Sequence, residues 1–365
     1  MSLAQRVLLV AAAPALALVV AAVATTAVLL GSGDSLGDFW QVMLSPPDAR
    51  QVVGIVNVAA VLYLSGIAAA VGFRMNLFNI GVEGQYVVAT FVAALFAGQA
   101  LLPGYLNTVA TVLVAMAGGA AWAGIAALLR VTRGISEVIS TIMLNAIAVS
   151  LIAYLLRRFG QREGQTIVTD QIEVSSRVAS FPLVAGEDTE VYGLALLAIV
   201  VGVGFAVLLN RTRFGFDLRA TGQSESAAVA SGVSVSRMIV YTMLLSGAIA
   251  GLIGMPDLFG ESYQFGSTIQ TGVGFTGIAV ALLGRNHPAG IAVGAVVFAY
   301  LAQQGSPLDI EANISPEIIA VTQGVVVLSV VIAYEITRRY RSRLEQAQVA
   351  QALRRERAEG EQVPA

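Results

Sequence analysis

Residues 106–129 read LNTVATVLVAMAGGAAWAGIAALL and contain no charged side chain. A helix rises about 1.5 Å per residue, so about 20 apolar residues are enough to cross the roughly 30 Å hydrocarbon core of a bilayer. The stretch is therefore long enough and apolar enough to be a transmembrane helix. It predicts that the chain is a membrane protein.

Stretches of the same kind recur along the whole chain. Together with the first they lie at about 7–30, 52–72, 77–101, 106–129, 135–156, 191–209, 238–258, 273–284, 288–304 and 317–334. The stretch at 273–284 is too short to cross a bilayer as one straight helix, so we expect a discontinuous or partly re-entrant helix there. The sequence predicts an all-α polytopic membrane protein of about ten transmembrane segments, one of them short or discontinuous.

The composition excludes several classes of protein. Hydrophobic residues make up 56% of the chain and charged residues 12%, against about 25% charged in soluble domains. Because there is no Cys and only one His, a disulfide framework, a thiolate metal site and a multi-histidine metal site are excluded. All 21 basic residues are Arg. A P-loop needs a Lys on the nucleotide phosphates, so a standard ATP-hydrolysing subunit is excluded. A net charge of −2 also gives no basic face for nucleic acid.

The arginines predict the orientation of the chain, since cytoplasmic loops carry an excess of basic residues. With the N-terminus inside and ten alternating segments, only five of the 21 arginines fall outside: Arg50, Arg157, Arg158, Arg162 and Arg177. Both termini are then cytoplasmic. We expect a membrane domain over 1–336 with an external loop at 157–190 and a cytoplasmic loop at 210–237, followed by a charged cytoplasmic tail at 337–365.

Polar residues open one of the apolar segments. Residues 76–85 read NLFNIGVEGQ and include Asn79, Glu83 and Gln85. Ionisable groups at membrane depth are costly and usually functional, and transporter sites favour helices broken by polar and glycine residues. The alternative is a helix start that Asn79 caps and Glu83 braces against a neighbour. The residues alone leave both interpretations open.

Two further amides lie in the middle of predicted spans, Asn57 and Asn145. Each taken alone is more easily explained as a hydrogen bond between helices, although together with Glu83 they could line a polar path. Asp257 follows Pro256 near the outer end of its segment. Its position allows either a helix end or a functional carboxylate.

The cytoplasmic loop contains a predicted short helix. Ser224 is placed to cap it, Glu225 lies in its first turn, and Gly232 is a natural stop. Ala227 and Ala228 are small and favour a helix. Such a helix can seat in a groove of another protein or can simply connect two spans.

Three motifs resemble a known family: NLFNIGVEGQ at 76–85, LRATG at 218–222 with Ala227–Ala228 and Gly232, and GIAVALLGRN at 277–286. Over about residues 50–335 the chain resembles the membrane subunits of ABC importers for branched-chain amino acids and simple sugars, and most of all the nucleoside-type permease. Such importers often pair two different permeases, and this chain resembles the first type.

The resemblance implies a partner for the cytoplasmic loop and for the external face. Residues 219–232 are expected to form a coupling helix that seats on a separate ATPase, which holds ATP and magnesium. The coupling residues are Arg219, Gly222, Glu225, Ala227, Ala228 and Gly232. A second, similar permease subunit and an extracytoplasmic substrate-binding lipoprotein complete the expected assembly, in the plasma membrane of a bacterium. The chain itself is expected to bind no cofactor or metal and to be no enzyme.

The predicted function is that of a permease subunit of an ATP-driven importer, with a nucleoside as cargo. The predicted pathway residues are Asn57, Asn79, Glu83, Gln85, Asn145, Phe275 and Thr276. Amides and the carboxylate can hydrogen-bond ribose hydroxyls and base edges, and Phe275 can stack on a base. The alternatives are a monosaccharide or branched-chain amino acid cargo, and an ion-coupled secondary transporter. An intramembrane enzyme has little support, because few catalytic groups are present.

Overall fold

The computed structural model describes residues 19–266, 269–333, 335–336, 339 and 346. The chain divides into two compact units, which are treated separately. The larger is Ser45–Gln303, and the smaller joins the described parts of Met1–Leu44 and Gln304–Ala365. Both units are predominantly helical, as the apolar segments predicted.

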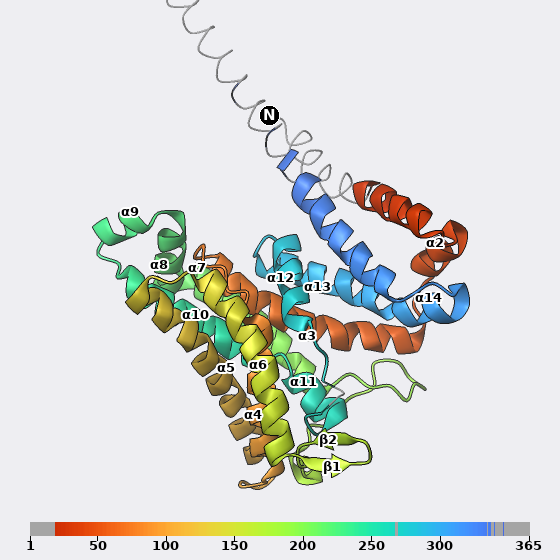
Figure 1. Cartoon of the computed structure of the whole chain (residues 1–365), viewed down its shortest axis with the longest axis horizontal. Coiled ribbons are helices and arrows are strands. Elements are labelled where there is room, and N and C mark those ends of the chain that lie inside the picture. Colours follow the sequence, from red (N-terminus) through yellow and green to blue (C-terminus); the bar gives the residue numbers. More distant parts are fainter. Residues whose placement is uncertain (1–18, 267–268, 334, 337–338, 340–345, 347–365) are drawn as a thin grey trace, which may run out of the picture. The chain divides into compact units, whose positions relative to one another are not determined.

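The long helices of the larger unit are α3 (Ala49–Phe73), α4 (Val82–Gly98), α5 (Tyr105–Arg133), α6 (Glu137–Phe159), α7 (Leu196–Arg211), α10 (Val235–Gly251), α12 (Val273–Leu283) and α13 (Pro288–Gln303). Helix α3 packs against α10, α12 and α13, whereas α5 packs against α4 and α10. Figure 1 shows the diagonal group of α4, α5, α6 and α10. Helix α3 begins with a capping box in which Asp48 and Gln51 exchange hydrogen bonds.

Small residues allow α5 and α10 to approach closely. A Cβ atom added to Gly119 would lie 2.1 Å from the carbonyl oxygen of Gly247, and one added to Gly251 would lie 2.2 Å from that of Ala115. In a bilayer, such contacts between backbones replace the hydrophobic driving force as the source of helix association.

Short elements complete the larger unit. Strands β1 (Gln161–Glu163) and β2 (Thr166–Val168) form an antiparallel hairpin, with Arg162 opposite Ile167. The remaining short elements are η1 (Val174–Ser176), η2 (Gly193–Ala195), α8 (Arg213–Gln223), α9 (Glu225–Ala230), α11 (Met255–Asp257) and the π-helical η3 (Leu258–Ser262). The hairpin departs from the all-α expectation. It lies within the loop predicted at 157–190, where the chain is polar.

Six helices in the described part of the chain are long and apolar enough to cross a membrane, and four shorter apolar helices accompany them. The six are Ala49–Phe73, Tyr105–Arg133, Glu137–Phe159, Gly193–Arg211, Val235–Ser262 and Pro288–Ala312. The shorter ones are Val19–Ser32, Val82–Gly98, Val273–Leu283 and Glu317–Ala333. Each of the ten predicted segments overlaps one of these helices. The expectation of a short helix at 273–284 is confirmed, because α12 has 11 residues.

The smaller unit contains α2 (Leu36–Leu44), α14 (Gly305–Ala312) and the apolar helices Val19–Ser32 and Glu317–Ala333. The Trp40 indole N–H donates a hydrogen bond to Thr26 Oγ1 at 3.2 Å. The first 12 residues of the segment predicted at 7–30 lie outside the described residues, as does the tail predicted at 337–365 apart from Arg339 and Gln346. Arg339 Nε lies 2.7 Å from Glu335 Oε1.

Candidate solute site and coupling segment

Glu83 holds the first turn of α12. Its two carboxylate oxygens accept hydrogen bonds from the backbone N–H groups of Gly272 and Gly274, each at 2.7 Å, and the residue is 5% exposed. The first N–H groups of a helix have no partner within the helix and carry a partial positive charge, so a carboxylate is well suited to them. Gly272 has a positive φ of 84°, and a Cβ on Gly274 would lie 2.3 Å from the Glu83 nitrogen. Glycine is therefore required at both positions.

Asn79 and Gln85 form a reciprocal amide pair. Each side-chain NH₂ group donates to the other residue's oxygen at 3.0 Å. The Asn79 NH₂ group also donates to Ser246 Oγ on α10 at 2.8 Å, and its oxygen accepts from the Gly81 N–H. The turn before α4 is thereby fixed to α10.

Asn145 fixes the same turn from the side of α6. Its oxygen accepts from the Gly84 N–H and its NH₂ group donates to the Ile80 carbonyl, both at 2.9 Å. Asn79, Glu83, Gln85 and Asn145, here called the polar network, are all buried. Of the two interpretations open for this stretch, the contacts match the braced helix start. A role of these four residues in the solute pathway stays a prediction.

The two pathway residues predicted on α12 lie differently. The Phe275 side chain is half exposed, and the Thr276 hydroxyl donates to the Gly272 carbonyl within its own helix at 3.1 Å. Neither residue contacts the polar network through a hydrogen bond. The Phe275 side chain therefore lies on an open face of α12.

Asn57 lies at a different place, in a cavity of about 240 Å³ that we call the polar cavity. Its oxygen accepts from the Tyr192 N–H and its NH₂ group donates to the Glu190 carbonyl, both at 3.0 Å. Asn57 thus ties α3 to the end of the loop at 157–190. Of the seven predicted pathway residues it alone lines the cavity.

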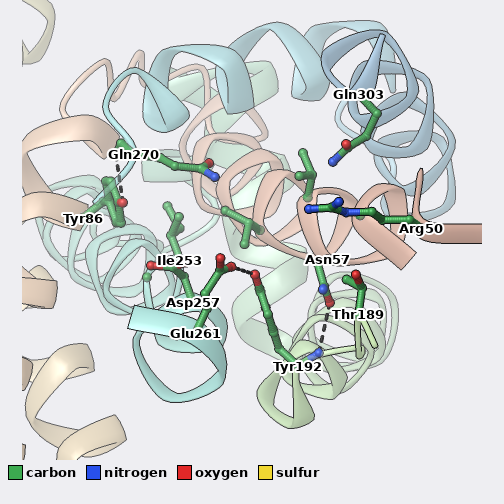
Figure 2. Close-up of a pocket in the computed structure, with 14 residues that line it drawn as sticks. Arg50, Asn57, Tyr86, Thr189, Tyr192, Ile253, Asp257, Glu261, Gln270 and Gln303 are labelled. Carbon is green, nitrogen blue, oxygen red and sulfur yellow. Dashed lines mark hydrogen bonds between the residues drawn. The ribbon is translucent and has the colours of Figure 1, made fainter. Parts of the chain in front are cut away.

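The polar cavity is enclosed by α3, α4, the segment before η2, the α11–η3 turn, Gln270 and the end of α13. Figure 2 shows Asp257 and Glu261 close together, with Arg50 and Gln303 across the cavity from them. Ser262 Oγ donates to Asp257 at 2.7 Å, and the Tyr192 hydroxyl donates to Glu261.

Sequence reasoning left Asp257 undecided and missed Arg50, Glu261, Gln270 and Gln303. Arg50 lies more than 200 positions before the other four, and no spacing in the sequence relates them. The one available signal was an acidic residue near the outer end of an apolar segment, which applies to Asp257 alone.

The predicted coupling segment forms two helices, whereas the resemblance implied one helix over 219–232 and the residues predicted a short helix capped by Ser224. Helix α8 ends at Gln223, and Ser224 starts α9 by accepting a hydrogen bond from the Ala227 N–H at 3.3 Å. Ser224 has extended backbone angles, which a continuous helix does not allow. The predicted cap at Ser224 is confirmed, and Gly232 follows α9 with a positive φ of 85°.

Helix α8 packs closely on the turn between α3 and α4. A Cβ atom on Gly222 would lie 2.5 Å from the Arg74 carbonyl oxygen. Arg74 Nε in turn donates to the carbonyl of Asn286, just beyond α12, at 2.8 Å. Burial, followed by the charges of Arg219 and Arg285, lowers the pKa of Arg74 from its ordinary value. Three arginines therefore gather at this end of α12.

The predicted coupling residues differ in exposure. Arg219 donates to the carbonyl of Leu209 at the end of α7, at 2.5 Å, and Ala228 is buried. Glu225 and Ala227 are exposed, and the Val229 side chain is 61% exposed. Helix α9 therefore presents small and apolar groups on its free face.

Within the described part of the chain, no three His, Cys, Asp or Glu side chains are grouped as metal ligands would be. Residues 51–333 match the family described as branched-chain amino acid transport system permease components. The chain belongs to this family. It is accordingly a multi-pass membrane permease and a transport protein, not an enzyme.

Three relatives are similar over most of their length. The permease is 32% identical to the guanosine ABC transporter permease protein NupP of Bacillus subtilis (strain 168), covering 88% of this chain and 93% of that one. It is 32% identical to the glucose ABC transporter permease protein TsgB13 of Haloferax volcanii, with 78% and 76% covered. It is 31% identical to the nucleoside ABC transporter permease protein NupB of Lactococcus lactis subsp. cremoris, with 79% and 81% covered.

Proposed function

We propose that this permease forms half of the translocation pathway of an ATP-driven ABC importer for nucleosides in the plasma membrane of a bacterium. The observation that carries the proposal is the 32% identity along 88% of the chain to a guanosine permease, with a nucleoside permease at 31%. Similarity over nearly the whole length of both chains supports a shared role and not only a shared fold.

The arrangement of the larger unit supports the proposed orientation. Helices α8 and α9 lie at the opposite end of its long helices from the β1–β2 hairpin (Figure 1). The arginines Arg74, Arg219 and Arg285 gather at the α8 end, which fits a cytoplasmic face. In this proposal the ten apolar segments all enter the membrane, both termini are cytoplasmic, and the loop at 157–190 is external.

Helix α9 is the proposed docking element for a separate ATPase subunit, which holds ATP and magnesium. Its exposed Ala227 and Val229 suit a groove in another protein. A displacement of α9 would move α8. The contact of Gly222 with Arg74, and the hydrogen bond of Arg74 to Asn286, would transmit it to the end of α12. Glu83 accepts hydrogen bonds from the other end of α12, so this helix can move as a rigid body.

ATP would drive accumulation only if the ATPase binds the two states of the pathway with different affinity. We propose that α12 is the element that differs between these states. A second, similar permease subunit would complete the pathway, with the half-exposed Phe275 available at their boundary. An extracytoplasmic binding lipoprotein would deliver the solute to the loop at 157–190.

One other cargo has specific support. The glucose permease of Haloferax volcanii is as similar in identity as the guanosine permease, although less of each chain is covered. A monosaccharide is therefore the second candidate. Nucleosides and monosaccharides share a ring with neighbouring hydroxyl groups, so the two cargoes make similar demands on a site.

The test is uptake of radiolabelled guanosine and glucose into cells that lack or carry the gene. We expect gene-dependent guanosine uptake that stops on ATP depletion under a maintained ion gradient. Uptake that survives ATP depletion and collapses with the ion gradient would overturn the ABC assignment. Gene-dependent uptake of glucose alone would replace the proposed cargo.

A matched pair of variants tests the docking element. Ala227→Arg places a long charged side chain on the free face of α9, where the structure leaves it room. We expect the ATPase to be lost from the purified complex while the permease remains folded. Ser226→Arg, at the neighbouring exposed position, is the control for added charge and should have the smaller effect if Ala227 faces the groove.

A further inference from the structure

The polar cavity keeps hydrogen-bonding capacity that the fold does not use. Among the described residues, the guanidinium of Arg50 and the side-chain amides of Gln270 and Gln303 have no hydrogen-bond partner. Gln303 is half-buried, whereas Arg50 and Gln270 are exposed at the edge of the cavity, and all three line one space in Figure 2. Polar groups that converge on a cavity are the usual means by which a pocket orients a ligand.

Asp257 and Glu261 supply two neighbouring carboxylates. They are four residues apart on the continuous turn of α11 and η3, so their side chains leave the same side of that turn. The structure gives each one hydrogen bond, from Ser262 and from Tyr192. A carboxylate can accept about four, so both can accept further hydrogen bonds from a solute.

The size of the cavity limits what it holds. Its volume of about 240 Å³ is below the roughly 300–1,000 Å³ of pockets that enclose whole drug-sized ligands. It therefore suits a single sugar ring, with any attached base remaining outside. Val58, Val61 and Ile253 supply an apolar wall against which the carbon face of such a ring can pack.

The charges of the cavity favour an uncharged solute. Two carboxylates face one guanidinium, which gives a formal charge of −1 on the walls. An anionic solute such as a nucleoside phosphate would be repelled by this charge. Neutral hydroxyl groups, in contrast, can donate to the carboxylates in strong charge-assisted hydrogen bonds.

We propose that the polar cavity binds the ribose of the nucleoside. The carboxylates of Asp257 and Glu261 accept hydrogen bonds from the neighbouring 2′- and 3′-hydroxyls. A single carboxylate binds the ribose 2′-hydroxyl in this way in dinucleotide-binding folds. The Gln303 amide donates to a hydroxyl oxygen from the opposite wall. This inference rests on the proposed function, which supplies a nucleoside as cargo.

The experiment compares uptake of radiolabelled guanosine and 2′,3′-dideoxyguanosine in the gene-deletion strain carrying the wild-type gene or variants. The test variant is the doubly substituted Asp257→Asn with Glu261→Gln, which keeps side-chain volume. Glu173→Gln removes an exposed carboxylate of the loop at 157–190 that does not line the cavity, and serves as the control. Purified protein of each variant is checked for a single sharp peak on gel filtration.

We expect wild-type and control strains to take up guanosine at least tenfold faster than the dideoxy compound. The double variant should lose about tenfold of its guanosine uptake and leave dideoxyguanosine uptake unchanged, since a hydrogen bond to a charged group is worth about a factor of ten or more. The binding protein is the same in every strain, so this change arises in the permease.

Three outcomes would overturn the inference in distinguishable ways. An unchanged preference in the double variant would exclude hydroxyl recognition in the cavity and leave the proposed function intact. An equal fall in the uptake of both compounds would show that the double variant has a general transport defect and has not lost recognition of the hydroxyls. If the wild-type strain takes up no nucleoside, the proposed function fails and the assignment of the cavity fails with it.

Discussion

The polar network around α4 and the polar cavity contain the same kinds of side chain but use them in opposite ways. In the network, each polar side chain of Asn79, Glu83, Gln85 and Asn145 is buried and bonded within the protein. In the cavity, the exposed Arg50 and Gln270 and the half-buried Gln303 have no hydrogen-bond partner among the described residues. A polar residue in an apolar span therefore does not by itself mark a binding site. What matters is whether its hydrogen bonds are already satisfied.

This difference predicts opposite phenotypes. Substitutions in the network should lower stability first, because they leave buried backbone groups without partners. Substitutions in the cavity should spare stability and change the solute that is carried. The free energy of unfolding of purified protein in detergent, measured beside uptake, separates the two.

The largest loss of stability is expected for Glu83→Ala. It leaves the N–H groups of the half-buried Gly272 and the buried Gly274 without an acceptor. Each lost charge-assisted bond costs about 1.5–3 kcal/mol, so we expect a loss of about 3–6 kcal/mol and little folded protein. Glu83→Gln keeps one acceptor oxygen. Its free energy of unfolding should lie between those of the alanine variant and wild type. A fully stable Glu83→Ala protein with altered cargo preference would instead move Glu83 into the solute site.

Asn145→Ala should have the next largest effect. It removes the partners of the Gly84 N–H and the Ile80 carbonyl, and these groups lie in the buried turn before α4. We expect a loss of about 2–4 kcal/mol, measured by chemical unfolding. Asn145→Asp keeps the acceptor for Gly84 and should restore part of this loss. Equal stability of the alanine variant and wild type would contradict the bracing role.

Asp48→Ala lies outside both the polar network and the polar cavity, and it calibrates the measured changes in the free energy of unfolding. Asp48 caps α3 in an exposed capping box with Gln51. Loss of an N-cap costs about 1 kcal/mol. The expected fall in the unfolding midpoint is therefore small, and uptake should not change. A larger fall would mean that the start of α3 has contacts beyond the cap.

The smallest effect on stability is expected for Gln303→Ala in the cavity. Its amide has no partner among the described residues, so its removal should change the free energy of unfolding by less than about 0.5 kcal/mol. Uptake should nevertheless fall several-fold, because a donor to the solute is lost. A destabilised variant with unchanged uptake would remove the contrast between the two regions.

Much of the fold was predictable from the chain alone. Apolar stretches such as 106–129 must be helical in a bilayer, because only a helix satisfies the backbone of a single segment there. The helix of 11 residues at 273–284 and the cap at Ser224 also followed from local sequence. These features depend on neighbouring residues only, which is why composition and spacing predict them.

Other features required the tertiary structure. The sequence left two interpretations of Glu83 open, and only the approach of α12 shows that two N–H groups occupy its carboxylate. It also placed Arg219 with the coupling residues without showing that its guanidinium bonds to the end of α7. A helix start at Ser224 was expected, but the separate helix α8 before it was not.

The sequence by itself determined that this protein lies in a membrane, lacks the groups for its own ATP chemistry, and carries the motifs of a permease. Only the tertiary structure decided which polar residues are already satisfied and which share a cavity. The physical reason is that membrane insertion depends on runs of adjacent residues, whereas a cavity joins distant segments. Asp257 and Gln303 line the cavity with Arg50, which lies more than 200 positions before either of them.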